Sequence, residues 1–224
     1  MYEYISEALQ SREEQYILTY FDFDNFKPYN DKYGFRNGDR VILYFADLLK
    51  NYSQISNRFI GHIGGDDFFM GIRRENSQSL YKEMVELADK FRKDVESFYD
   101  EEAIKSGFTL SSDREGNIKR FNLLSVSIVI LEIPANRQRI YLTEEISKCL
   151  ATLKGKAKRC SNHVYHTNIY ELEDLFSHQL LPIQPINGFN GVDMLNSVDK
   201  VKNIVQLKRY LTAPLTPLQK ICLR

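Results

Sequence analysis

The segment "YILTYFDFD", residues 16–24, decides the fold that we expect for this chain of 224 residues. It is rich in aromatic and β-branched residues and ends abruptly in acid, which is typical of a strand that enters a loop. Side chains alternate between the two faces of a strand, so Asp22 and Asp24 share one face and Phe21 and Phe23 the other. The sequence therefore predicts a strand that presents two carboxylates together near its end.

The segments that follow this strand predict a helix and then a hairpin. Apolar residues recur at helical spacing from Val41 to Tyr52, with Asp39 in the N-cap position. The runs "RFIGHI" (58–63) and "FFMGI" (68–72) are separated by "GGDD" (64–67), which indicates a β-hairpin.

The rest of the chain continues the alternation of helices and strands. We expect a long helix over 79–99, a polar and turn-rich segment over 100–120, a buried central strand within "FNLLSVSIVILEI" (121–133), a helix starting at Thr143, and a last strand within "HVYHTNIYEL" (163–172). The order β-α-β-β-α-β-α-β predicts an α/β (α+β) fold, in which helices pack on a central mixed or antiparallel sheet.

Three regions are expected along the chain. Residues 1–13 form an N-terminal helix or linker, residues 14–170 the main domain, and residues 171–224 a partly helical C-terminal extension. The extension contains the amphipathic stretch "SVDKVKNIVQLKRYL" (197–211). Packing on the domain, dimerisation and a linker role all remain open for it.

Composition excludes several functional classes. Lysine plus arginine equals aspartate plus glutamate at 30 each, so no basic excess points to a nucleic-acid partner. No apolar run approaches the ~20 residues that span a bilayer, and the acidic start lacks the apolar centre of a signal peptide, so we expect a cytoplasmic location. Three widely spaced cysteines argue against a disulfide framework and against a zinc site.

The segment "FDFDNFKPYNDKYGFRNGDRVI", residues 21–42, contains most of the residues that we expect to bind a metal ion and a nucleotide. A strand-end carboxylate that meets a hairpin carboxylate makes an oxygen-rich pocket suited to Mg²⁺. Lys27 and loop N–H groups then neutralise phosphate. Asn30 and Asp39, on either side of a turn from Gly34 to Gly38, offer donor and acceptor atoms that match the edge of a guanine.

These motifs resemble those of a known family. "DFDNFKPYNDKYGFRNGD" (22–39), followed 25 residues later by "GGDDF" (64–68), is similar to the GGDEF domain of diguanylate cyclases. The resemblance extends from about Glu14 to Ile169. It implies a fold like the polymerase palm and the condensation of two GTP into cyclic di-GMP, with Mg²⁺ or Mn²⁺ as cofactor. Each protomer of that family holds one GTP, so activity implies a homodimer.

The resemblance also implies the roles of individual residues. Asp22, Asp66 and the backbone carbonyl of Phe23 match the metal ligands, and Asp66, Asp67 and Lys27 the catalytic positions. The remaining matches are to nucleotide-binding positions: Asn30 and Asp39 for guanine, Phe26, Gly64 and Gly65 along the site, and Lys154 and Lys158 of "CLATLKGKAKR" (149–159) for the triphosphate.

Several positions depart from the family pattern. Asp67 stands where the family usually has Glu, His62 where active members commonly have Arg, and Val129 where a glycine is usual. Positions 55–58 lack the Arg-x-x-Asp motif of product inhibition, so feedback through that site is not expected. These departures leave a second interpretation open, a catalytically impaired GTP-binding regulatory module.

Two further alternatives concern the relatives of this domain. "HIGGDDFF" (62–69) and "DREGNIKRFNLLSVSI" (113–128) resemble GGDEF domains of chains that also hold EAL and CBS domains, which would make this chain a fragment of a longer regulator. A CRISPR-type palm that makes cyclic oligoadenylates also uses a Gly-Gly-Asp-Asp hairpin. Asn30 and Asp39 favour GTP over ATP and argue against that alternative.

Overall fold

The structure is a computed structural model that describes residues 1–172 except 56, 113–114, 138 and 140. Its elements, in chain order, are α1 (Tyr2–Gln10), β1 (Tyr16–Asp24), α2 (Phe26–Tyr33), α3 (Phe35–Ser53), β2 (Arg58–Gly64), β3 (Asp67–Arg73), α4 (Ser77–Asp94), a 3-10 turn (Val95–Phe98), α5 (Glu101–Ser106), β4 (Phe108–Ser112), β5 (Ile118–Asn122), β6 (Ser125–Ile133), α6 (Thr143–Ala157), β7 (Val164–Asn168) and a second 3-10 turn (Ile169–Leu172). The predicted extension beyond residue 172 lies outside the described residues.

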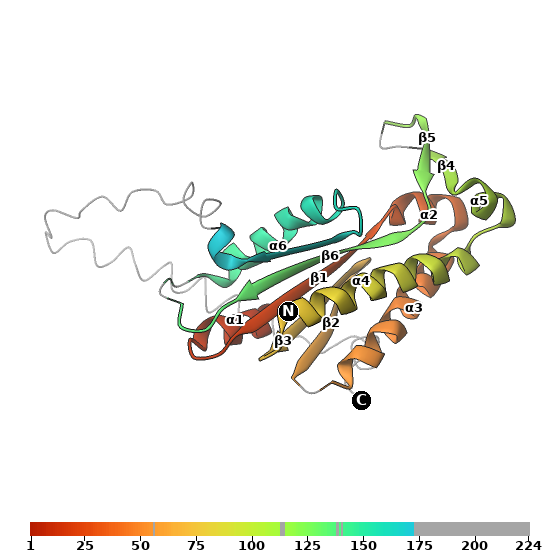
Figure 1. Cartoon of the computed structure of the whole chain (residues 1–224). Coiled ribbons are helices and arrows are strands. Elements are labelled where there is room, and N and C mark those ends of the chain that lie inside the picture. The colour runs from red at the N-terminus through yellow and green to blue at the C-terminus, as the bar shows by residue number, and fades with distance from the viewer. Residues whose placement is uncertain (56, 113–114, 138, 140, 173–224) are drawn as a thin grey trace, which may run out of the picture. The chain divides into compact units, whose positions relative to one another are not determined.

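A five-stranded sheet in the order β2-β3-β1-β6-β7 forms the centre of the domain (Figure 1). Neighbouring strands are antiparallel except β6 and β7, which are parallel. The predicted α/β architecture with a central mixed sheet is therefore confirmed. The strand predicted over residues 16–24 is β1, and it lies in the middle of this sheet.

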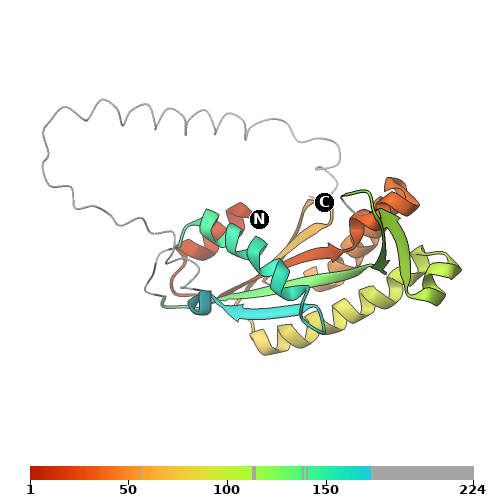
Figure 2. The same cartoon turned by 90° about the horizontal axis from the view of Figure 1, so that it is seen from above.

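Helices cover both faces of the sheet, and each face has its own core (Figure 2). On one face α3 and α4 pack against Phe21 and Phe23 of β1, in a cluster rich in phenylalanine. On the other face α1 and α6 pack against Leu18 and Tyr20 of the same strand. Strand β1 is thus buried from both sides, and its alternation sends each side chain into one of two separate cores.

The connection after β1 differs from the predicted turn. Residues 26–33 form α2, and α3 begins at Phe35 rather than after Asp39, so Asp39 lies inside the helix and not at its N-cap. Gly34, with a φ of 84°, lets the chain turn sharply between the two helices. Gly38 lies within α3, where its missing side chain lets α2 approach closely. A Cβ at this position would lie 1.9 Å from Asn30 Oδ1.

The segment predicted to be polar and turn-rich also contains regular structure. It forms α5 and the two-stranded β4-β5 sheet, which extends beyond the central sheet (Figure 1). Asp100 caps α5 by accepting a hydrogen bond from the Ala103 N–H at 2.8 Å, and Gly107 ends it in a left-handed conformation. These elements are short, so sequence periodicity gives little signal for them.

Helix α1 is part of the packed domain. Ile5 and Ala8 are fully buried, and the Tyr4 ring stacks on Phe59 with centroids 5.3 Å apart. Tyr4 also lies over the backbone of Gly71 in β3, where an added Cβ would be 2.1 Å from a ring carbon. The absence of a side chain at Gly71 therefore lets α1 dock onto the sheet.

We predict that Gly71→Ala lowers the free energy of unfolding by about 1–3 kcal/mol, because the new methyl group overpacks against the Tyr4 ring. The measurement is urea unfolding followed by circular dichroism. Gly61→Ala in the neighbouring strand is the matched control, since the nearest atom to its Cβ is 3.4 Å away. An equal loss in both variants would contradict this account of α1 docking.

Candidate functional site

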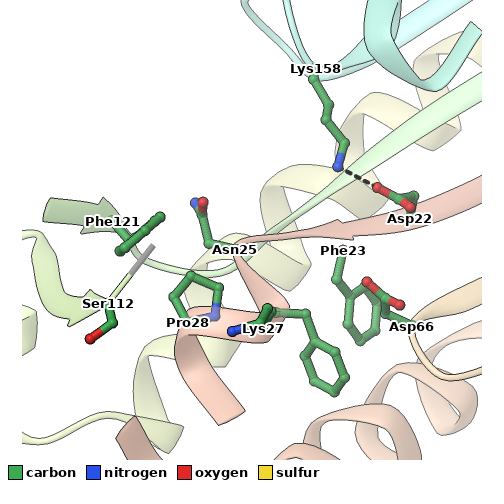
Figure 3. A pocket seen from close by; sticks show the side chains of 10 residues that line it. Asp22, Phe23, Asn25, Lys27, Pro28, Asp66, Ser112, Phe121 and Lys158 are labelled. Atoms are coloured by element: carbon green, nitrogen blue, oxygen red, sulfur yellow. Dashed lines mark ion pairs between the residues drawn. The ribbon is translucent and has the colours of Figure 1, made fainter. Parts of the chain in front are cut away.

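A cavity of about 410 Å³ opens where β1 ends and α2 begins (Figure 3). Its lining combines acidic, basic and aromatic residues: Asp22, Phe23, Asn25, Phe26, Lys27, Pro28, Asp66, Ser112, Phe121 and Lys158. They come from β1, α2, the β2-β3 hairpin, the β4-β5 sheet and the end of α6. The cavity therefore gathers six of the residues predicted from the sequence, namely Asp22, Phe23, Phe26, Lys27, Asp66 and Lys158.

Two lysines of α6 hold the carboxylate of Asp22. Lys154 Nζ lies 3.0 Å from Asp22 Oδ1, and Lys158 Nζ lies 2.5 Å from Oδ2. Residues four apart lie on the same side of a helix, so one turn of α6 brings both ammonium groups to the same strand end. Burial alone would raise the pKa of Asp22, but the ion pairs with Lys158 and Lys154 outweigh it and lower the pKa.

Lys154 also joins the two neighbouring strands. Its Nζ lies 2.7 Å from Asp67 Oδ1, and Asp67 is the residue directly opposite Asp22 in the β1-β3 pairing. Tyr20 adds its ring face, with Lys154 Nζ 4.4 Å from the centroid. One cation thus lies between two carboxylates and reduces their repulsion across the sheet.

Asp66 lies at the tip of the hairpin, partly buried and close to two other carboxylates. Burial, together with the nearby carboxylates of Asp22 and Asp67, raises its pKa above the ordinary value for aspartate. A raised pKa means that the ionised form of Asp66 is not fully compensated by the lysines. Asp66 is therefore the position in this cluster where an added cation would be most favourable.

The hairpin turn is built by its glycines and by His62. Gly64 and Gly65 have φ values of 151° and 57°, and no atom lies within 4 Å of a Cβ built at either residue. The predicted glycine turn is therefore open towards a ligand on this side. His62, where the family pattern has Arg, places Nε2 2.9 Å from the Gly65 carbonyl oxygen and stacks on Phe68.

Lys27 projects from the first turn of α2 beside the cavity. Its side chain is 64% exposed and pairs with Asp31 at 2.6 Å, so it can swing towards an anion without breaking a buried contact. No side chain caps the N-terminus of α2, where Asn25 adopts a left-handed conformation. A helix N-terminus beside a lysine favours negative charge, as phosphate binding requires.

Asn30 and Asp39, the residues predicted to bind guanine, do not line this cavity. Asn30 packs from α2 against Gly38 of α3, and Asp39 is exposed on α3; neither lines the cavity around Asp22. Asn30 Oδ1 is buried without a hydrogen-bond partner. A buried acceptor of this kind is costly unless a donor satisfies it, so this oxygen lowers the stability of the α2-α3 junction.

The oxygen atoms around the cavity are the kind of ligand that a hard divalent cation prefers. Asp22, Asp66 and the Phe23 backbone offer oxygen atoms around one cavity, which is the donor chemistry of Mg²⁺. Among the described residues, however, no three His, Cys, Asp or Glu side chains converge on a single point. The protein ligands of a cation would thus number two carboxylates and a carbonyl, with the other positions left to ligand phosphate and water.

Sequence reasoning missed the residues around Asp24. This buried carboxylate accepts hydrogen bonds from Ser125 Oγ at 2.8 Å and from Ser127 Oγ at 2.8 and 3.0 Å, and His163 Nδ1 lies 3.1 Å away. The partners are more than 100 residues distant along the chain. Only the alternation of β1, which places Asp24 on the face of Asp22, gave any signal for this cluster.

Lys154→Met should lower the free energy of unfolding by about 1–3 kcal/mol, because it leaves the facing carboxylates of Asp22 and Asp67 without their shared cation. The partial exposure of the cluster keeps the loss below that of a fully buried pair. Lys156→Met on the same helix is the control, since its ammonium contacts only the Tyr165 hydroxyl among the contacts described. Chemical unfolding of both variants checks this, and equal losses would contradict it.

Asp66→Asn should stabilise the protein at pH 7 in the absence of divalent cations. The folded pKa of Asp66 is raised, so ionisation of this carboxyl opposes folding above that pKa and has no effect below the unfolded value near 4. The gain in melting temperature over the unaltered protein should therefore shrink as the pH falls from 7 towards 4. Asp47→Asn, at an exposed site, controls for the general effect of removing a charge; a gain independent of pH would contradict the assignment.

The comparisons with known proteins bear on the family and the fold of this chain. The family model described as "Diguanylate cyclase, GGDEF domain" matches residues 1–114. Among solved structures, the GGDEF domain of DgcB from Caulobacter crescentus in complex with c-di-GMP superimposes with a TM-score of 0.50 at 22% identity, covering 73% of this chain and 84% of that one. At this identity the likeness shows a shared fold.

Curated relatives include staphylococcal proteins that are named uncharacterized membrane proteins. One from Staphylococcus aureus strain USA300 is 34% identical over 161 residues, which is 71% of this chain and 41% of that protein. One from Staphylococcus epidermidis is 32% identical over 128 residues, 52% of this chain and 34% of that protein. The chain thus spans less than half the length of these relatives. No helix in the described part of the chain is long and apolar enough to cross a membrane, and the expected cytoplasmic location stays a prediction.

The family match spans the motifs at residues 22–39 and 64–68, and the fold of the central sheet agrees with it. This chain belongs to the GGDEF domain family of diguanylate cyclases.

Proposed function

We propose that this chain condenses two molecules of GTP into cyclic di-GMP in a reaction that depends on Mg²⁺ or Mn²⁺. The observation that carries the proposal is the convergence of Asp22, Asp66, Lys27 and Lys158 on one cavity. Acidic oxygens for a cation and amines for phosphate are the two requirements of nucleotidyl transfer. Family membership supports the same chemistry.

Asp22, Asp66 and the Phe23 carbonyl would hold the divalent ion in this proposal. When bound, it would polarise the α-phosphate of GTP. Lys27 and Lys158 would bind the triphosphate and compensate the charge that develops on the departing pyrophosphate. Asn30 and Asp39 would hold the guanine through amide and carboxylate groups that match its edge.

The attacking 3′-hydroxyl belongs to a second GTP. Asp67, given a catalytic position by the family resemblance, lies in this structure against Lys154. We infer that Asp67 acts through this ion pair, which keeps Lys154 beside Asp22. Each protomer would hold one nucleotide in the cavity around Asp22, so the two nucleotides would be held by two protomers that face each other, and the active form would be a homodimer.

The domain is proposed to occupy residues 14–170, with α1 packed against it. The curated relatives extend well beyond the matched region. We infer that the chain acts within a longer signalling protein, in which EAL and CBS domains are candidate partners. Neither nucleic acid nor a membrane segment enters the proposed reaction.

The decisive assay incubates purified protein with GTP and Mg²⁺ and separates the products by chromatography. We expect cyclic di-GMP and pyrophosphate, with a rate that rises more steeply than linearly with protein concentration because dimers form. Asp66→Ala should lower the rate at least ~100-fold, equivalent to about 2.7 kcal/mol of transition-state stabilisation. Asp47→Ala, at an exposed site, should retain the rate.

The same samples separate the alternatives. A rise in melting temperature with GTP and Mg²⁺ but no product above the Asp66→Ala background would favour a GTP-binding regulatory module instead, because a ligand that binds only the native state stabilises it. Product from ATP in place of GTP would favour a cyclic oligoadenylate synthase. Absence of both turnover and a GTP-dependent shift would refute the proposal.

A further inference from the structure

Asp24 is an acidic residue of β1 that the proposed chemistry leaves unused. Its side chain is only 10% exposed, and both carboxylate oxygens accept hydrogen bonds from Ser127, one of them also from Ser125. A buried carboxylate is costly unless it is paired, and two hydroxyl donors alone do not compensate a full charge. Asp24 therefore requires a cation nearby.

Lys158 is the lysine that meets this requirement. Its Nζ lies 3.4 Å from Asp24 Oδ1 and 2.5 Å from Asp22 Oδ2, so one ammonium group stands between two carboxylates of the same strand face. Asp22 and Asp24 differ in their surroundings. Asp22 lines the cavity beside Asp66, whereas Asp24 lines a second cavity of about 510 Å³ on the other side of Lys158.

The position of Lys158 matters because it lines both cavities. In the proposed function Asp22 binds a divalent cation, and a cation on Asp22 would repel the ammonium group now paired with it. Without a second anchor, the flexible lysine side chain would then leave the site for solvent, since 44% of it is already exposed. Asp24 lies close enough to keep the Lys158 ammonium group in the site.

Ser125 and Ser127 hold the Asp24 carboxylate by hydrogen bonds, and His163 packs beside it. His163 has a φ of 57°, unusual for a residue other than glycine, and this conformation brings its Nδ1 to 3.1 Å from Asp24 Oδ2. Its carbonyl oxygen accepts a hydrogen bond from the Ile128 N–H at 2.8 Å, which ties the loop after α6 to β6. Asp24 is thus held by hydrogen bonds from β6 and enclosed by the α6-β7 loop.

We propose that Asp24 is a positioning residue for Lys158. It retains the ammonium group at the junction of the two cavities when Asp22 engages a metal ion, so that Lys158 stays directed at the triphosphate. The inference rests on the proposed function, because it assigns Lys158 a phosphate to bind. Asp24 itself touches neither the nucleotide nor the metal in this scheme.

The test is a double-mutant cycle on nucleotide affinity, with 3′-deoxy-GTP and Mg²⁺ as the probe. This analogue lacks the attacking hydroxyl, so isothermal titration calorimetry reports binding without turnover. We expect Asp24→Asn and Lys158→Met each to weaken binding about tenfold, which is about 1.4 kcal/mol. The double variant should be within about twofold of Lys158→Met alone, because Asp24 acts only through that lysine.

Further variants separate positioning from folding. Ser127→Ala removes a donor to Asp24 and should weaken binding about threefold, again without effect when Lys158 is Met. If Asp24→Asn does not fold, as judged by thermal unfolding, the Ser127 cycle decides alone. Asp89→Asn, at an exposed site on α4, controls for loss of negative charge and should leave affinity unchanged.

The outcomes distinguish this inference from the proposed function. Effects of the Asp24 and Lys158 substitutions that multiply in the double variant would overturn positioning and leave only a structural role. Normal affinity in Asp24→Asn would overturn it as well, while the GTP site stood. No binding of the analogue by the unaltered protein would overturn both proposals.

Discussion

Strand β1 is paired along both edges and buried on both faces, and this constraint governs the rest of the domain. A strand in that position has no freedom to slip, because a shift of one residue would exchange the contents of two separate cores. Phe21 and Phe23 are therefore committed to the α3-α4 side and Asp22 and Asp24 to the α6 side. The position of the two carboxylates on the α6 side therefore follows from how the two cores are packed.

Carboxylates on the α6 face make that helix an electrostatic partner as well as a packing partner. Its apolar residues dock on the sheet, while Lys154 and Lys158 extend from its last turns to the end of β1. The cluster contains more acidic than basic side chains, and burial, together with the carboxylates of Asp22 and Asp67, raises the pKa of Asp66. A site that is electrostatically unsatisfied without its ligands sacrifices some stability for affinity, as functional sites often do.

The positions that depart from the family pattern have local explanations in this fold. His62 contacts the Gly65 carbonyl and so supports the turn that carries Asp66. Asp67 takes up Lys154, a contact that the sheet register places opposite Asp22. Val129, where a glycine is usual, is fully buried in the core beneath α1 and α6 and pairs with Tyr20 across the sheet. Each substitution is thus accommodated without loss of the central sheet.

The sequence by itself determined the features that depend on neighbours along the chain. The alternation of residues 16–24, the glycine hairpin and the helical spacing of α4 and α6 are local patterns, so strand, turn and helices followed from them together with Asp22, Lys27 and Asp66. The short elements α2, α5, β4 and β5 were missed because segments of five to eight residues give little periodic signal. The start of α3 was placed too late because Gly38 looks like a turn residue, whereas in the structure its missing side chain makes room for Asn30. Only the tertiary structure decided that Lys154 is shared between two strands, that Asn30 does not line the cavity, and that Asp24 meets Ser125, Ser127 and His163. Those contacts join residues separated by many tens of positions, and a sequence carries no local signal for which distant side chains will share a charge.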